Sequence, residues 1–256
     1  RLIPVFNSLT TSLSTLKTIQ PSFDLVFSEL DKIGSKSEDI SKIDYIKFKN
    51  KIELKNVYFN YENNEKSIIN NLNLTINKGD KIGLIGESGS GKSTLVNIIM
   101  GLLKHTSGKI FVDDTEILYD KKQVIDNIGY VPQEVYLIED ELKKNIALGL
   151  KNEEISNHKL QSVCIAAQIN QFVEKLDNGF ETIVEENGRN FSVGQKQRIG
   201  VARALFRDPD ILIFDESTSS LDSDTEEKFI EEVFLTSKDK TIIFISHKMS
   251  ALTKCD

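Results

Sequence analysis

The stretch from Gly86 to Ser93 has the composition of a phosphate-binding loop. It reads Gly-Glu-Ser-Gly-Ser-Gly-Lys-Ser and fits the pattern G-x-x-x-x-G-K-[ST] between an apolar segment and a predicted helix. Glycines let the backbone wrap closely around an anion with its N–H groups pointing inward, and the N-terminus of the following helix adds a fixed positive potential. We therefore predict that Lys92 neutralises the β- and γ-phosphates of a nucleotide and that the Ser93 hydroxyl lies on Mg²⁺. The residues assigned to ATP binding here are Gly86, Glu87, Ser88, Gly89, Ser90, Gly91, Lys92, Ser93 and Thr94.

Two adjacent carboxylates follow a second apolar segment. Ile211 to Phe214 leads directly into Asp215 and Glu216, and parallel α/β sheets bind their ligands at the C-terminal ends of the strands. Successive side chains of a strand point in opposite directions, so Asp215 can hold the metal while Glu216 faces the attacking water. In isolation such a pair can equally be a solvated turn. Downstream of a phosphate-binding loop it indicates catalysis.

A third motif carries a family resemblance. Phe191 to Arg198 reads Phe-Ser-Val-Gly-Gln-Lys-Gln-Arg and precedes the arginine-bearing segment Val201 to Leu205. This resembles the signature motif of ATP-binding cassette (ABC) proteins, and the resemblance extends from Lys51 to Asp256. It implies an α/β fold of the P-loop NTPase (RecA-like) type: a mixed sheet core with an antiparallel β subdomain and a helical subdomain inserted at about 134–204. ATP and Mg²⁺ are the implied cofactors.

The resemblance implies roles at further positions. Tyr61 matches the aromatic residue that stacks on adenine, and Gln133 matches the glutamine that reaches the metal and the attacking water. Ser219 to Asp222 resembles the loop that contacts the opposite subunit, and His247 matches the histidine that contacts the γ-phosphate. Each position alone has a plainer interpretation: packing for Tyr61, a surface turn for Gln133 and a strand-end histidine for His247. The implied catalytic set is Glu216, His247, Lys92 and Gln133, and the implied metal set is Ser93, Gln133 and Asp215.

The signature residues imply a dimer. Ser192, Gly194 and Gln195 begin a predicted helix, whose N-terminus can bind an anion, yet the family places this helix end far from its own phosphate loop. Two cassettes are therefore expected to pair head to tail, with each ATP between the Gly86–Ser93 loop of one copy and the Ser192–Gln195 helix end of the other. Hydrolysis would remove the γ-phosphate contact and let the dimer open.

The sequence departs from the family at two positions. Val193 and Glu185 stand where the family most often has glycine. A β-branched residue strongly disfavours positive φ, so Val193 is predicted to have a negative φ. We expect ATPase activity to survive this change, and we expect Glu185 to affect coupling to the membrane domain.

Two domains are predicted, a helical extension and linker at 1–49 and the cassette at 50–256. Apolar residues recur every three or four positions from Leu2 to Leu30, which is helical spacing, and Pro21 is expected to break that helix. The polar stretch from Gly34 to Lys42 is typical of a linker.

Within the cassette, alternation at 51–76 predicts antiparallel strands, and Ile82–Ile85 predicts a short buried strand. Helices are predicted at Thr94–Leu103 and His158–Leu176, with another ending at Phe206. Ile211–Phe214 and Ile242–Ile245 are continuous apolar runs, which is the pattern of buried parallel strands.

Composition excludes several classes of protein. The 256 residues carry a formal net charge of −7, which provides no basic field for binding nucleic acid or an anionic membrane. No apolar run approaches the roughly 18 residues of a spanning helix. The only cysteines, Cys164 and Cys255, have neither disulfide nor zinc spacing.

The extension before the cassette favours an exporter. It is similar to the cytoplasmic end of the last transmembrane helix in multidrug exporters and, above all, in flippases for lipid-linked oligosaccharides. The expected partners are the chain's own transmembrane domain and a second nucleotide-binding domain, with no nucleic acid. The expected location is the cytoplasmic face of the inner membrane, and the chain, which begins at Arg1 and ends soon after His247, is expected to be a soluble, C-terminally truncated fragment.

The sequence fits two other kinds of ABC protein less well. A soluble ABC ATPase that acts on DNA or the ribosome would carry a long insertion between Gln133 and Ser192 or a second cassette, and this chain has neither. A non-hydrolysing regulatory cassette would lack Glu216 or His247, and both are present.

Overall fold

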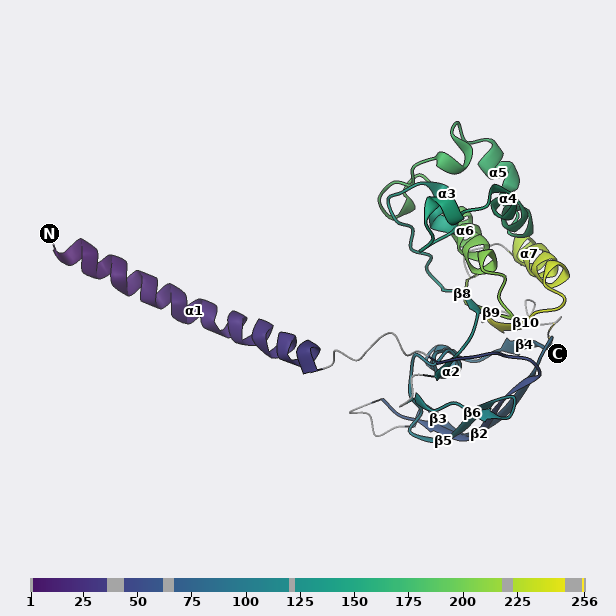
Figure 1. Ribbon diagram of the computed structural model, residues 1–256, viewed down its shortest axis with the longest axis horizontal. Helices are drawn as coiled ribbons and strands as arrows, with labels where there is room; N and C mark the ends of the chain where they lie inside the picture. The colour runs from purple at the N-terminus through teal and green to yellow at the C-terminus, as the bar shows by residue number, and fades with distance from the viewer. Residues whose placement is uncertain are drawn as a thin grey trace. The chain divides into compact units, whose positions relative to one another are not determined.

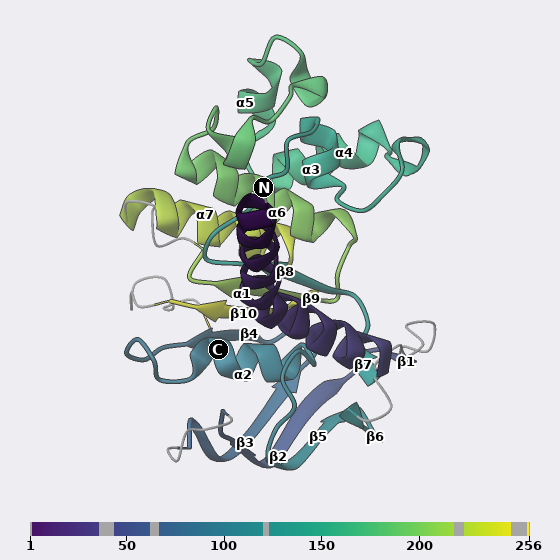
Figure 2. The ribbon, with the colours of Figure 1, turned by 90° about the vertical axis from the view of Figure 1, so that its left-hand side faces the viewer.

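The computed structural model describes residues 2–35, 44–61, 67–119, 123–217, 223–246 and 255, without the side chains of 32–35 and 223–228. The chain divides into two compact units, Arg1–Ile43 and Asp44–Asp256, and each is described by itself (Figures 1 and 2).

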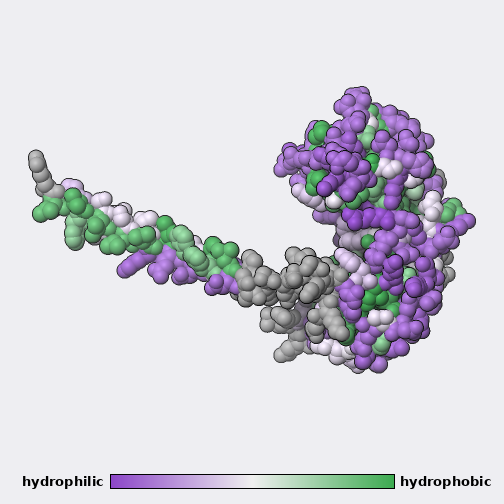
Figure 3. Space-filling view, viewed as in Figure 1, coloured by the Kyte–Doolittle hydropathy of each residue, from purple (hydrophilic) through white to green (hydrophobic). Residues whose placement is uncertain are grey.

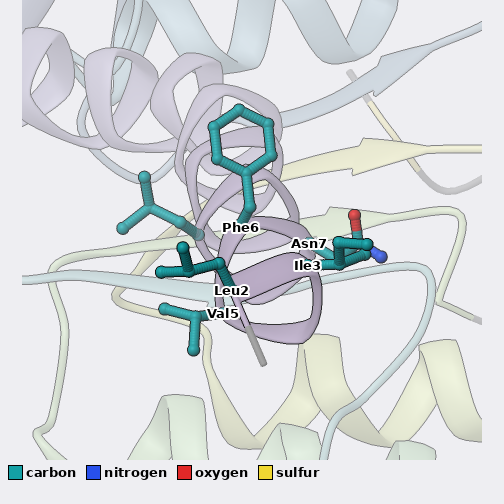
Figure 4. A pocket seen from close by; sticks show the side chains of 6 residues that line it. Leu2, Ile3, Val5, Phe6 and Asn7 are labelled. Atoms are coloured by element: carbon teal, nitrogen blue, oxygen red, sulfur yellow. The ribbon is translucent and has the colours of Figure 1, made fainter.

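The first unit is a single helix, α1 (Leu2–Ser35). Its apolar side chains are exposed and gather along the helix (Figure 3), and Leu2, Ile3, Val5 and Phe6 surround an open apolar hollow near its start (Figure 4).

The predicted break at Pro21 is wrong, because Pro21 lies inside the helix. A proline removes one backbone hydrogen bond, and here the turns on both sides carry the helix across that loss. Among the described helices, none is both long and apolar enough to cross a bilayer.

An antiparallel sheet forms one layer of the second unit. Its strands lie in the order β3-β2-β5-β6. The buried side chains of β2 alternate on either side of a register shift between Leu54 and Val57, and they are Ile52, Leu54, Val57 and Phe59. This confirms the antiparallel strands expected at 51–76. The bounds are β2 (Lys51–Phe59), β3 (Ile69–Asn77), β5 (Ser107–Val112) and β6 (Thr115–Glu116). A separate parallel pair joins β1 (Asp44–Ile46) to β7 (Gln123–Ile125).

The sheet that carries the chemistry is parallel, with its strands in the order β4-β10-β9-β8. Its bounds are β4 (Lys81–Leu84), β8 (Ile128–Val131), β9 (Ile211–Asp215) and β10 (Thr241–Ile245). Every residue of β9 and β10 is buried, as predicted. The predicted burial of β4 is wrong: all of its residues are half-buried, because β4 is an edge strand that pairs only with β10 among the described strands.

The central sheet is covered on both faces. On one face, Ile211 and Ile213 share a core with the antiparallel sheet and α2 (Lys92–Ile99). On the other, Leu212 and Phe214 share a core with α6 (Val193–Phe206) and α7 (Ser223–Thr236). Figure 1 shows α2 on the side of the antiparallel sheet and α6 and α7 on the opposite side. The two cores therefore lie on opposite faces of β9, the strand that ends in Asp215.

The helical segment between β8 and β9 consists of short elements. They are α3 (Leu142–Ile146), η3 (Asn152–Glu154), α4 (Asn157–Ala166), α5 (Asn170–Glu174), η4 (Gly179–Glu181) and η5 (Glu186–Gly188), followed by α6. The single helix predicted at His158–Leu176 is wrong. Gln168 has φ 57° and interrupts it, and the turn places Ala167 and Ile169 in the core.

Candidate functional site

The loop between β4 and α2 requires glycine at its end. Gly91 is the N-cap of α2 with φ 92°, in the left-handed region that L side chains rarely adopt. A Cβ at this position would lie 2.9 Å from Ile68 Cγ2 and 3.3 Å from the Ile68 carbonyl oxygen. No side chain caps α2, so the first amides of the helix have no side-chain acceptor. The N-terminus of α2 therefore leaves backbone N–H groups that could bind an anion.

Lys92 folds back over this loop. Its Nζ donates hydrogen bonds to the carbonyl oxygens of Gly86 at 2.8 Å and Glu87 at 2.9 Å. Both acceptors are neutral, and in the described part of the chain Lys92 makes no ion pair. Its positive charge is thus held beside the loop without a carboxylate to offset it.

Ser93 and Asp215 meet across a long sequence separation. Ser93 Oγ donates to Asp215 Oδ1 at 3.1 Å, and Asp215 is only 7% exposed at the end of β9. A hydroxyl and a carboxylate are hard oxygen ligands of the kind that Mg²⁺ prefers. No group of three or more His, Cys, Asp or Glu side chains among the described residues could hold a metal alone. The pair fits Mg²⁺, which commonly binds through one or two protein ligands plus substrate phosphates.

A residue missed by the sequence analysis completes this contact. Tyr130, in β8, donates its hydroxyl hydrogen to Asp215 Oδ2 at 3.1 Å. Burial raises the pKa of Tyr130 to about 12, and the neighbouring charge of Asp215 adds to this effect. The phenol therefore stays protonated, and remains a donor, at neutral pH. Only the pairing of β8 with β9 brings these residues together, and no local motif signals it.

One cleft of about 380 Å³ collects most of the predicted nucleotide site. The residues that line it are Tyr61, Ile68, Ser88, Gly89, Ser90, Gly91, Lys92, Ser93, Thr94, Gln133 and Glu216. Glu216 follows β9 with φ 48°, and its N–H donates to the Ile245 carbonyl at 3.1 Å. This left-handed turn separates Glu216 from Asp215, so the two carboxylates have different surroundings. His247 and the Ser219–Asp222 loop lie outside the described residues.

Tyr61 lies at the edge of the cleft. Its ring packs edge-on against Phe59, with centroids 4.9 Å apart, and its hydroxyl is 3.3 Å from Thr94 Oγ1. The side chain is nevertheless 44% exposed. The ring is therefore held in place by packing and still presents surface to a ligand.

The signature residues are not part of this cleft. Ser192, Gly194 and Gln195 form the start of α6, where Ser192 and Gln195 make a reciprocal capping box. The Ser192 N–H donates to Gln195 Oε1 at 2.8 Å, and the Gln195 N–H donates to Ser192 Oγ at 3.3 Å. Val193 has a negative φ, as predicted, and its side chain is 56% exposed in the first turn.

Comparison with known proteins identifies the family. The family model for the ABC transporter matches residues 69–219, more than half of the chain. The chain belongs to the ABC transporter family.

Its curated relatives are exporters and flippases. The putative multidrug export ATP-binding/permease protein YgaD of Bacillus subtilis (strain 168) is 33% identical over 249 residues, which cover 97% of this chain and 43% of YgaD. The ATP-dependent lipid A-core flippase of Haemophilus influenzae (strain 86-028NP) is 36% identical over 209 residues, covering 81% of this chain and 35% of the flippase. The chain therefore spans about two-fifths of the length of these relatives.

A solved structure of an ABC exporter supports the same assignment. The structure of a bacterial Atm1-family ABC exporter with ATP bound matches with a TM-score of 0.77 and 28% identity over 90% of this chain and 41% of that one. The α/β P-loop NTPase fold and the exporter-type nucleotide-binding domain expected from the sequence are confirmed. These relatives give no support to an ABC ATPase that acts on DNA or the ribosome.

In this ABC domain, Gln133 belongs to a segment that is bound to the signature helix α6. The guanidinium of the half-buried Arg203 donates from Nη1 to the Tyr136 carbonyl at 3.0 Å and from Nε to the Asn145 carbonyl at 2.8 Å. A Cβ at Gly200 would lie 2.5 Å from Val135 Cγ2, so the backbone of α6 approaches the segment directly. The residues that follow Gln133 are thereby held to the helix that Ser192 begins.

Proposed function

We propose that this chain binds and hydrolyses ATP with Mg²⁺ as the nucleotide-binding domain of an ABC exporter. The observation that carries the proposal is the convergence, in one cleft, of Lys92, Ser93, Gln133 and Glu216, with Asp215 bonded to Ser93. A nucleotide-binding module without catalysis needs the loop alone. Glu216, a carboxylate that lines the same cleft, would add a base for hydrolysis.

Each residue has a distinct chemical task. The Gly86–Thr94 loop and Lys92 bind the phosphates, and Tyr61 stacks on adenine at the cleft edge. Ser93, Asp215 and Gln133 would hold Mg²⁺, which supplies a positive charge that offsets the charge developing on the phosphates. Glu216 polarises the attacking water, and Lys92 stabilises the negative charge of the transition state. His247, outside the described residues, is proposed to contact the γ-phosphate.

The Ser192–Gln195 helix end supports a dimeric mechanism. It lies outside the cleft of its own chain, so its role in ATP binding requires the cleft of a second nucleotide-binding domain, identical or different. Because that interface would consist largely of two nucleotides and polar loops, we expect a monomer that dimerises weakly when ATP is added. The transmembrane domain would supply the high effective concentration that makes pairing efficient.

The transport role follows from the relatives. They are named as a multidrug export protein and a lipid A-core flippase, so export or flipping of a substrate across the membrane, powered from its cytoplasmic face, is the proposed function of the longer protein. Its own transmembrane domain is the proposed partner, and nucleic acid is not.

Replacement of Glu216 by Gln tests hydrolysis directly. The amide is nearly isosteric but does not accept the proton of the water, so phosphate release should fall by about 10²–10⁴-fold while ATP still binds. ATP should then hold the dimer together for longer, as measured by size-exclusion chromatography with ATP and Mg²⁺. Glu174→Gln, an exposed carboxylate in α5, is the matched control for the charge change. Wild-type turnover in Glu216→Gln would refute Glu216 as the base and direct attention to Gln133 and His247.

A further inference from the structure

Both carboxylate oxygens of Asp215 have their own side-chain donor. Ser93 Oγ donates to Oδ1 and the Tyr130 hydroxyl donates to Oδ2, each at 3.1 Å. Ser93 belongs to the phosphate loop, whereas Tyr130 comes from the neighbouring strand β8 and does not line the nucleotide cleft. Tyr130 therefore contacts Asp215 without being one of the residues that line the cleft.

The sheet register explains how Tyr130 reaches this position. Tyr130 is paired with Ile213 in the parallel ladder between β8 and β9. Ile213 and Asp215 lie two residues apart and so point to the same face of the sheet. The tyrosine ring packs against the core on that face, and its length carries the hydroxyl forward to the carboxylate at the strand end.

A carboxylate at this depth needs such a donor. Asp215 is 7% exposed, so solvent replaces little of any lost hydrogen bond, and a buried acceptor without a partner is costly. Ser93 Oγ and Asp215 Oδ1 lie together at the end of the phosphate loop and would hold Mg²⁺. Among the residues that the structure describes, Tyr130 is thus the side-chain donor to Asp215 that is not itself a proposed metal ligand.

We propose that Tyr130 is a positioning residue for Mg²⁺: its hydroxyl fixes the rotation of the Asp215 carboxylate, so that Oδ1 faces Ser93 and the phosphates before the metal arrives. The proposal rests on the function proposed above. Residues that orient metal ligands from outside the coordination shell commonly contribute 10–100-fold to metal affinity. Tyr130 contacts Asp215 but does not line the nucleotide cleft, so its loss should weaken the binding of Mg²⁺ and leave the binding of metal-free ATP unchanged.

Tyr130→Phe is the decisive variant, because it keeps the ring and removes only the donor. Binding of a fluorescent ATP analogue is measured in EDTA and then across a Mg²⁺ titration, with Mn²⁺ binding followed by electron paramagnetic resonance as a readout independent of turnover. We expect the metal-free ATP affinity to stay within about twofold of wild type and the metal concentration at half-saturation to rise by about tenfold.

Tyr119→Phe is the matched control. Tyr119 is half-buried, like Tyr130, and donates to the Ile98 carbonyl at 2.9 Å, so its variant loses an equivalent hydrogen bond away from Asp215. We expect both the metal-free ATP affinity and the metal dependence to match wild type in this variant.

A double-mutant cycle with Asp215→Asn tests whether Tyr130 acts through Asp215. We expect Tyr130→Phe to change metal binding little further once Asp215 has been replaced. An unaltered metal dependence in Tyr130→Phe, or an equal loss of metal-free ATP affinity, would overturn the positioning role. Failure of the wild-type chain to bind ATP under any condition would instead overturn the proposed function.

Discussion

Two helix N-termini in this ABC domain are proposed to bind the same phosphates, and they are capped in opposite ways. α2 begins at Gly91, which has no side chain and leaves the first turn without a side-chain cap. α6 begins at Ser192, which forms a capping box with Gln195. The first amides of any helix have no acceptor within the helix, and its N-terminus is the positive end of the helix dipole. α2 thus starts as an open anion site, whereas α6 starts with its own side chains in the place of a ligand.

The difference indicates which half of the proposed dimeric ATP site is complete in one chain. α2 adds Lys92 and the Ser93–Asp215 pair to its open amides, so we propose that it binds a nucleotide without a second chain. To bind α6, the phosphates of an ATP held by a second chain must displace the Ser192 side chain from the helix N-terminus. Loss of such an N-cap costs about 1 kcal/mol of stability. Hydrogen bonds to a charged group are worth about 1.5–3 kcal/mol each, so displacement is favourable only when ATP already lies opposite. Pairing should therefore depend on the nucleotide.

The largest loss of ATP affinity should come from a substitution at the N-terminus of α2, which has no side-chain cap. Lys92→Ala removes the cation that lies over the loop and, with it, at least two charge-assisted hydrogen bonds to phosphate. ATP affinity should fall by about 100-fold or more, measured by calorimetric titration. Lys175→Ala, an exposed lysine that follows α5, controls for the lost charge. Retained ATP affinity in Lys92→Ala would show that α2 is not the primary phosphate site.

A smaller effect is expected at the edge of the same cleft. Tyr61→Ala should weaken ATP binding by about 1–3 kcal/mol, by analogy with base stacking on aromatic side chains, and should relax the preference for adenine over guanine. Tyr61→Phe keeps the ring and loses only the hydroxyl contact with Thr94, so it should bind ATP nearly as well as wild type. Normal ATP binding by Tyr61→Ala would mean that Tyr61 serves packing against Phe59 alone.

The smallest effect on ATP binding by the monomer should come from a substitution at Ser192, the N-cap of α6. Ser192→Ala should lower the free energy of unfolding by about 1 kcal/mol through loss of the N-cap, measured by urea denaturation, without changing the ATP affinity of the monomer. Ser156→Ala, the N-cap of α4, should have a similar cost in stability.

Only Ser192→Ala of these two N-cap variants should also weaken ATP-driven dimerisation, measured by light scattering with Glu216→Gln as background. Equal dimerisation in the two variants would contradict a phosphate-binding role for α6.

Much of the domain could be predicted from local sequence. The phosphate loop is recognisable because glycine, lysine and serine act within one turn, and β9 and β10 because strands buried on both faces need unbroken apolar runs. Elements that depend on their surroundings were predicted less well. The sequence predicts a buried β4, but this strand lies at an edge of its sheet. Gln168 interrupts a segment with a helical pattern, and α1 continues through Pro21.

The sequence by itself determined which groups are present: the loop with Lys92 and Ser93, the Asp215–Glu216 pair and the signature helix, each of which is a local pattern. Only the tertiary structure decided which of these groups meet. Tyr130 donates to Asp215, Ile68 leaves no room for a side chain at Gly91, and Arg203 binds the segment after Gln133. These contacts join residues that are far apart in the chain, and strand register and helix packing set them through the burial of the two cores rather than through any local spacing.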